Sequence, residues 1–521
     1  MTEIRTYRGH IRNWKALCEE LKIEGAKTMS REEREPVILQ RAYEEWGHDM
    51  GLHMHGMFAF AIWDGEKQEL FCLRDPFGTK PFYYYLTEEG KLLYGTMIRD
   101  ILRDPAYHKE LNEDMLQIFL SLTYVAGEDT FFKGIKKLMP GRYLVWKPAS
   151  DNAEAGGSVE ITRYFVPTFC PDEEPALEDW ADEIHTTLQE IMKEVKDEDE
   201  KADSFLSGGV DSSYVLAMSD AQMTDSCGYD EPRFDESGLA KQTADLLGRG
   251  FSRCRITPEE YFAIVPYVME NMEQPLGDAS AIAFTLGCLA TAKHTKLCYS
   301  GEGSDEFFGG YNMYRNAPRY GDNLKNFYVG NTNIMKEEEK EKILLRYDPE
   351  NLPINLVKDI YEETEGLDPL AKMSDVDIQI WLEGDIYLNV DKMSTAAGLE
   401  IRMPLTDRRI FDIASRMPSR FKVNEEQNKV AFRTAAAKVL PEEIAFRKKL
   451  GFIVPIRIWL ADERYNADVR ARLTGSSAAK FFRTEELQAI YDEYVGGNSD
   501  LWRKIWTIYT FLVWYDIYFA D

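Results

Sequence analysis

One short stretch of this sequence combines residues that could hold a phosphate chain. Residues 204–213 read SFLSGGVDSS: an apolar strand, a Ser-Gly-Gly turn and then a helix beginning at about Ser212. Glycines let the backbone approach a ligand, and the N–H groups at a helix start bind anions. Asp211 lies inside this turn, and a carboxylate beside phosphates requires a cation between them. The stretch therefore predicts a phosphate loop with Mg²⁺, distinct from a Walker A loop because it has no GK[ST] sequence.

Three further motifs follow along the chain. A second glycine-rich turn after a strand, crowded with acids, is YSGEGSDEFFGGY at 299–311. It is followed by DKMSTAAGLEIRMPLTD (391–407) and RKKLGFIVPIRIWL (447–460). Asp211 and Asp305 would repel each other if they met, and a shared metal ion removes that conflict.

The loop SGGxDSS resembles the pyrophosphate loop of the N-type ATP pyrophosphatases. Taken with the other three motifs, the region from about Ala202 to the C-terminal end resembles the synthetase half of class B asparagine synthetase. By this resemblance Asp211 and Asp305 share Mg²⁺. The residues that would bind ATP are Leu206, Ser207, Gly208, Gly209, Asp211, Ser212, Cys227, Ser300 and Gly301. Cys227 stands where the family usually has an apolar β-branched residue, and cysteine packs as a small hydrophobe.

The resemblance also assigns catalytic roles. Glu302 would form the aspartyl-adenylate and handle the protons of attacking ammonia, work that suits a carboxylate held near anions. Lys449 would neutralise the charge that grows on the α-phosphate and on the tetrahedral intermediate, and its neighbour Lys448 is interpreted as a solvated charge. Asp407 ends a loop near the family's site, although the usual PFLD is PLTD here.

The implied reaction is a two-step amide ligation. Aspartate attacks the α-phosphorus of ATP and releases pyrophosphate, and ammonia then displaces AMP to give asparagine. The substrates are aspartate, ATP and ammonia, with Mg²⁺ as the metal.

The first part of the chain resembles the N-terminal-nucleophile glutaminase domain of the same family. The resemblance rests on AYEEWG (42–47), GMFAFAIWD (56–64), RDPFGTKPFYY (74–84) and FKGIKKLMPGRYLV (132–145). Residues 1 and 2 are Met and Thr where that domain starts with its nucleophilic Cys. The segment that follows the nucleophile has no counterpart either, so we expect a truncated domain that does not hydrolyse glutamine.

The remaining glutamine contacts are altered. YRGHIRN (7–13) aligns with a family YNGEIYN, so Arg8 and His10 replace the Asn and Glu, while Gly9 is kept. Asp75 matches a glutamine-contacting position. We interpret this set as a degenerate glutamine site and predict that Met1–Tyr7 pairs with the exposed sheet edge, or that a partner covers it.

Two other functions stay open. The first is a ligase whose amine lies in its own substrate, as in β-lactam synthetases and lasso-peptide cyclases. β-Lactam synthetases carry Tyr at the position of Glu302, which disfavours this alternative. The second is a decayed, non-enzymatic relative, which the intact acids and lysine disfavour.

The elements that position these residues indicate an α/β protein. Short strands separated by turns predict an N-terminal-nucleophile-hydrolase-like α+β sandwich over residues 1–166. Residues 167–176 read as a linker. Residues 177–521 begin with a helix at about Leu177 and then alternate buried strands with helices, which predicts an α/β ATP-pyrophosphatase domain (PP-loop, adenine nucleotide alpha hydrolase-like) with a helical C-terminal part.

Composition indicates which classes of partner and which cellular location to expect. The chain has 90 acidic and 62 basic residues, a net charge of −28, which disfavours nucleic acid. Its longest apolar stretch, TIYTFLVWYDIYFA, is too short to span a bilayer. Seven cysteines without CxxC indicate neither disulfides nor zinc, so a cytoplasmic protein is expected. A homodimer or an ammonia-supplying partner is left open.

Overall fold

The computed structural model describes residues 2–149, 157–196, 201–448, 451 and 453–520. The chain divides into two compact units: Met1–Asn112 with Gly127–Thr168, and Glu113–Ala126 with Phe169–Asp521. The prediction assigned all of residues 1–166 to the first domain, whereas residues 113–126 cluster with the second unit. This segment carries helix α4 (Asp114–Leu122), which packs against the C-terminal helix α23 (Trp502–Tyr518).

The first unit is built on two antiparallel sheets. The larger sheet has the strand order β1-β2-β3-β7-β8 and the smaller has the order β5-β4-β6. The strands are β1 Thr2–Ile11, β2 Gly56–Asp64, β3 Glu69–Arg74, β4 Tyr83–Leu86, β5 Leu92–Gly95, β6 Lys136–Lys137, β7 Arg142–Lys147 and β8 Ser158–Arg163. The helices are α1 Trp14–Glu20, α2 Arg31–Trp46 and α3 Ile98–Leu102. This is the predicted α+β sandwich.

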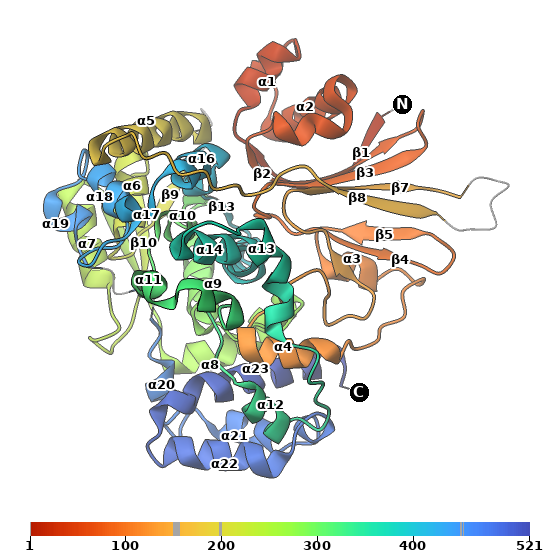
Figure 1. Cartoon of the computed structure of the whole chain (residues 1–521), viewed down its shortest axis with the longest axis vertical. Helices are drawn as coiled ribbons and strands as arrows, with labels where there is room; N and C mark the ends of the chain where they lie inside the picture. Colours follow the sequence, from red (N-terminus) through yellow and green to blue (C-terminus); the bar gives the residue numbers. More distant parts are fainter. Residues whose placement is uncertain (1, 150–156, 197–200, 449–450, 452, 521) are drawn as a thin grey trace. The chain divides into compact units, whose positions relative to one another are not determined.

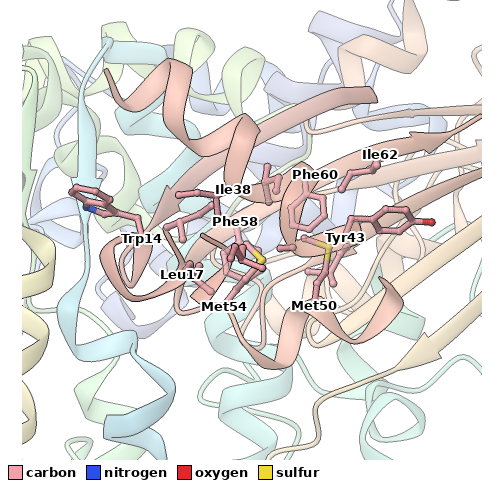
Figure 2. Close-up of a cluster of buried hydrophobic side chains, with 14 of the residues drawn as sticks. Trp14, Leu17, Ile38, Tyr43, Met50, Met54, Phe58, Phe60 and Ile62 are labelled. Atoms are coloured by element: carbon pink, nitrogen blue, oxygen red, sulfur yellow. The ribbon is translucent and has the colours of Figure 1, made fainter. Parts of the chain in front are cut away.

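Strand β2 separates two cores by the alternation of its side chains. Phe58, Phe60 and Ile62 pack against α1 and α2, as Figure 2 shows. Ala59 and Ala61 point the other way and pack with residues of the smaller sheet. Successive residues of a strand face opposite sides, so a nine-residue apolar strand can serve both cores.

Strand β1 forms the edge of the larger sheet. Residues Thr2 to Tyr7 pair antiparallel with β2, from Thr2 opposite Asp64 to Tyr7 opposite Phe60, with a register shift between Ile4 and Thr6. Thr2–Tyr7 therefore pairs with the sheet, which is the first of the two predicted arrangements, while Met1 lies outside the described residues.

The second unit centres on a parallel sheet with the order β11-β10-β9-β12-β13. The strands are β9 Asp203–Phe205, β10 Met223–Gly228, β11 Gly250–Arg255, β12 Leu297–Tyr299 and β13 Glu400–Arg402. The chain order reverses at β9, because β10 and β12 lie on its two sides. In open α/β sheets ligands bind beyond the carboxyl ends of the strands at such a switch point. The loops after β9 and β12 are therefore the expected place for a site.

Helices surround this sheet and form most of the chain beyond residue 340, as predicted (Figure 1). Those before β13 are α5 Leu177–Val195, α6 Val210–Met218, α7 Ser237–Leu246, α8 Pro258–Met272, α9 Ala279–Thr291, α10 Ser304–Phe308, α11 Ala317–Tyr320, α12 Glu337–Ile343, α13 Lys358–Glu363, α14 Pro369–Val376 and α15 Tyr387–Ala397. Those after it are α16 Arg408–Arg416, α17 Ser419–Lys422, α18 Val430–Ala436, α19 Glu442–Ala445, α20 Ile456–Trp459, α21 Ala467–Leu473 and α22 Thr484–Val495, followed by α23. Between α14 and α15 the segment η6 (Asp377–Ile386) is π-helical, a form found frequently at functional sites.

Candidate active site

The loop from β9 into α6 is shaped by its own serines. The Oγ atom of Ser207 accepts a hydrogen bond from the N–H of Gly209 at 3.1 Å and lies 3.0 Å from the Oγ of Ser212. The hydroxyl of Ser213 donates to the carbonyl of Gly209 at 2.7 Å. Helix α6 begins at Val210, two residues before the predicted start. The first N–H groups of an α-helix have no intrahelical acceptor, so this turn can bind an anion.

The loop after β12 lies directly against this helix start. A Cβ atom added to Gly301 would lie 2.6 Å from the backbone nitrogen of Ser212 and 2.7 Å from the carbonyl carbon of Asp211. These neighbours are backbone atoms and cannot rotate away. Glycine at position 301 is therefore what lets the two predicted loops meet.

A buried lysine joins the two predicted metal ligands. The Nζ atom of Lys429 lies 2.5 Å from Oδ1 of Asp211, 2.8 Å from Oδ1 of Asp305 and 2.7 Å from Oγ of Ser304. The hydroxyl of Ser304 also donates to Oδ1 of Asp211 at 2.7 Å. The lysine side chain is 1% exposed, whereas the two carboxylates are 14% and 15% exposed. The structure thus brings together two acids predicted from the sequence and a cation that sequence reasoning missed.

This pair of acids fits a hard divalent cation. Both carboxylates are partly open and contact one positive charge, and oxygen donors of this kind are the ligands that Mg²⁺ takes in phosphate sites. A Cβ atom on Gly310 would lie 1.6 Å from Oδ1 of Asp305 and 2.4 Å from Cε of Lys429. Gly310 therefore leaves the space that these two side chains occupy.

The backbone at Lys429 is unusual. Its φ of +58° lies in the left-handed region, which residues other than glycine rarely adopt. The adjacent Asn428 donates to the carbonyl of Gly310 at 2.8 Å and accepts from Nε of Arg315, and its own carbonyl accepts from Nε of Arg433. These bonds fix the turn, so the strain of order 1 kcal/mol at such a residue persists. A charged residue ahead of α18 gave no recognisable motif in the sequence.

The phosphate loop and the two acids line a cavity of about 460 Å³ at the carboxyl ends of β9, β10 and β12. That volume is in the range of small-molecule sites. Ten predicted residues line it: Leu206, Ser207, Gly209, Asp211, Ser212, Cys227, Ser300, Gly301, Glu302 and Asp305. The sequence did not assign a binding role to the other lining residues, which include Phe205, Asp278, Phe284, Trp381 and Asn389. All of these except Phe205 lie outside the four motifs.

Two predicted residues lie off the cavity wall. Gly208 contacts Nη1 of Arg447 through its carbonyl at 3.2 Å. Asp407 is fully buried at the start of α16, where it accepts from the N–H of Arg409 at 2.9 Å and from Nε of the same residue at 3.0 Å. A carboxylate that caps a helix and holds an arginine has a structural use, so these contacts give no support to the catalytic role predicted for Asp407.

Described residues on both sides of the predicted catalytic lysine lie near the phosphate loop or the cavity. Lys449 lies outside the described residues. Before it, Arg447 contacts the phosphate loop at Gly208 and also Gln242 of α7 at 3.1 Å; after it, Gly451 lines the cavity. Lys448 is exposed.

Burial raises the pKa values of two acids behind the site. Burial and the neighbouring charge of Asp305 raise the pKa of Glu306 to about 8, although Tyr311 donates a hydrogen bond to it at 2.6 Å. Burial likewise raises the pKa of Asp377, on η6, to about 7 despite hydrogen bonds from Tyr314 and Tyr328.

The residues of the predicted glutamine site are engaged with protein atoms. Arg8 donates to the sulfur of Met97, and the ring of His10, 4% exposed, lies 3.3 Å from Oε1 of Glu35. A Cβ atom on Gly9 would lie 2.0 Å from the carbonyl oxygen of Met57, so the adjacent strand requires glycine there.

Asp75 supports a turn. It is 1% exposed and accepts hydrogen bonds from the N–H groups of Phe58, Phe77, Thr79 and Lys80 and from the hydroxyl of Thr79. These five bonds occupy the carboxylate, so RDPFG has a structural reason to carry Asp, and the predicted glutamine contact gains no support.

Together, the parallel sheet, the serine–glycine loop at its switch point and the acid pair beside it define a nucleotide-binding domain of the ATP-pyrophosphatase kind. The family model described as asparagine synthase matches residues 183–516, and the model described as glutamine amidotransferase domain matches residues 2–155. The chain therefore belongs to the asparagine synthase family. Members are ligases that form C–N bonds and release AMP and pyrophosphate.

Individual relatives agree with this assignment. The glutamine-hydrolyzing asparagine synthetase 1 of Bacillus subtilis (strain 168) is 31% identical over 552 residues, covering 98% of this chain and 85% of that protein. The glutamine-hydrolyzing asparagine synthetase 3 of the same organism is 26% identical, covering 85% of this chain and 74% of that protein. A solved glutamine phosphoribosylpyrophosphate amidotransferase from B. subtilis, complexed with ADP and GMP, matches 48% of this chain and 45% of that chain at 11% identity. Its TM-score of 0.20 supports no conclusion.

The described residues include no helix that combines the length and apolarity needed to cross a bilayer.

Proposed function

We propose that this chain makes asparagine from aspartate, ATP and ammonia through a β-aspartyl-AMP intermediate. The observation that carries the proposal is the cavity in which the phosphate loop, Glu302 and the Asp211–Asp305 pair meet at the switch point of the sheet. A carboxylate oxygen of aspartate would attack the α-phosphorus and expel pyrophosphate. Ammonia would then attack the acyl carbon and expel AMP.

Different residues of the cavity would bind the phosphates, hold the metal ion and accept the proton. The α6 start and the loop serines would bind the phosphate chain through N–H and O–H donors. Asp211 and Asp305 would hold Mg²⁺, which when bound neutralises the charge of the departing pyrophosphate. Glu302 would accept a proton from the attacking ammonia. The role of Lys449 in stabilising charge at the α-phosphate stays a prediction.

Ammonia is the proposed nitrogen donor rather than glutamine. Support comes from the first unit, where Arg8, His10 and Asp75 all contact protein atoms instead of presenting the donors and acceptors that the family uses for glutamine. The ammonia could be free or delivered by a partner protein. A cytoplasmic location and a homodimer remain proposals of the same kind.

The test is pyrophosphate release from ATP with Mg²⁺ and aspartate, with ammonia or glutamine as nitrogen source. We expect release and asparagine with ammonia, and neither asparagine nor glutamate from glutamine. Glu302→Gln should lower the rate by about 100-fold, whereas Asp245→Asn, which alters an exposed ion pair on α7, should leave it unchanged. Release only with another carboxylic acid would favour the ligase with an internal amine, and glutamate formation would refute the choice of ammonia.

A further inference from the structure

Two cysteines of neighbouring strands face each other beside the cavity. Cys227 of β10 and Cys254 of β11 are direct partners in the parallel register. Both sulfurs lie under helix α9: Sγ of Cys227 is 3.6 Å from the carbonyl oxygen of Ala283, and Sγ of Cys254 is 3.8 Å from that of Leu286. The two thiols therefore point to the same side of the sheet.

The pair has backbone geometry that a disulfide can adopt. Paired strands lie about 4.8 Å apart, and disulfide-linked residues have Cα–Cα separations of about 4.4–6.8 Å. Neither residue is fully buried. By contrast, Cys72, Cys288 and Cys298 are buried, and burial raises the pKa of each of these thiols.

The two thiols differ in how readily they lose a proton. The neighbouring thiol of Cys227 lowers the pKa of Cys254, whereas Cys254 and burial raise the pKa of Cys227, so Cys254 is the group that more readily becomes a thiolate. A thiolate next to a second thiol is the arrangement that converts oxidation into a disulfide.

The position of Cys227 connects this thiol chemistry to the cavity. Cys227 lines the cavity, whereas Cys254 lies one strand further from the switch point. Gly287 of α9 packs against Cys227 so closely that a Cβ atom there would lie 2.7 Å from its sulfur. A bond to Cys254 would pull this sulfur away from its place in the wall and strain the contact with α9.

We propose that Cys227 and Cys254 form a reversible disulfide that weakens nucleotide binding in the adjacent cavity. With a peroxide as oxidant, the thiolate of Cys254 attacks the peroxide oxygen and becomes a sulfenic acid. Cys227 then attacks that sulfur, releasing water. Overall, two thiols and one hydrogen peroxide give one disulfide and two waters. The consequence for ATP rests on the proposed function, whereas the bond itself does not.

The experiment uses the full-length Cys170→Ser protein, which lacks an exposed thiol. After hydrogen peroxide treatment, peptide mass spectrometry should find the Cys227–Cys254 link, and dithiothreitol should remove it. Affinity for a fluorescent ATP analogue should fall about tenfold on oxidation and recover on reduction. In Cys227→Val, which restores an apolar β-branched wall, and in Cys254→Ser, peroxide should leave affinity unchanged.

The outcomes separate the two claims. A linked peptide with unchanged nucleotide affinity would overturn the proposed control of binding, and no linked peptide from folded protein would overturn the disulfide. If the reduced protein does not bind the ATP analogue at all, the proposed function fails, while the mass spectrum still decides whether the disulfide forms.

Discussion

Replacing Lys429 with methionine removes a positive charge that contacts both Asp211 and Asp305 while keeping the length of the side chain. The lysine is 1% exposed and contacts both carboxylates within 2.8 Å. Removing one partner from a buried ion pair costs about 3–5 kcal/mol, because the remaining charges stay buried and unpaired. Here the carboxylates are partly open to the cavity. We therefore expect the free energy of unfolding to fall by the lower end of that range, about 3 kcal/mol.

This loss of stability can be measured as a decrease in melting temperature. Unfolding entropy of about 2.1 cal/mol/K per residue, applied to a unit of this size, converts about 3 kcal/mol into a decrease of about 4 °C. Added MgCl₂ should raise the melting temperature of Lys429→Met more than that of the wild type, because in the variant no lysine ammonium competes with the metal ion for these two carboxylates.

The control is Lys241→Met, which breaks an exposed ion pair on α7 worth at most about 1 kcal/mol. Pyrophosphate release should fall about 100-fold in Lys429→Met and stay normal in the control. The reasoning is refuted if both variants melt at the same temperature and respond equally to MgCl₂.

Three further outcomes are expected. Gly301→Ala should weaken binding of an ATP analogue by more than about tenfold, because its Cβ meets backbone atoms of α6 at 2.6 Å, whereas Gly238→Ala, with open space around it, should not; equal affinities would contradict the proposed loop contact. Asp377→Asn should flatten the dependence of melting temperature on pH between about pH 4 and 7. The raised pKa of Asp377 means that its stabilisation is complete below about pH 4 and is lost as pH rises through about 7, up to about 4 kcal/mol, and an unchanged slope would show that this group does not titrate there. Asp75→Ala should lower the melting temperature without creating or removing any glutamate production, since five hydrogen bonds of its turn are lost, and a change in glutamate production would restore a glutamine contact.

Local sequence patterns located several elements well. GMFAFAIWD is strand β2 with the expected bounds, and the helix predicted from Leu177 is α5, Leu177–Val195. The helix after the phosphate loop begins at Val210 rather than Ser212, because Gly209 already serves as its N-cap. Such features depend on neighbouring residues, whose spacing the sequence displays directly.

Other features depend on contacts between distant segments. Residues 113–126 read as part of the first domain but belong to the second unit, since α4 buries its apolar residues against helices far along the chain. The capping role of Asp407 and the turn-forming role of Asp75 were also hidden, because a motif match does not show which hydrogen bonds a carboxylate makes.

By itself, the sequence determined the chemistry: a phosphate loop, a pair of acids and the order of motifs that identifies the family. Only the tertiary structure decided that Lys429 is the cation between those acids and that Cys227 faces Cys254. Both pairings join residues from separate strands or loops, and Lys429 and Asp211 are 218 residues apart in sequence. The physical reason is that register in a parallel sheet and the packing of loops at its carboxyl ends are set by the whole hydrophobic core. No local pattern of residue types predicts these two pairings.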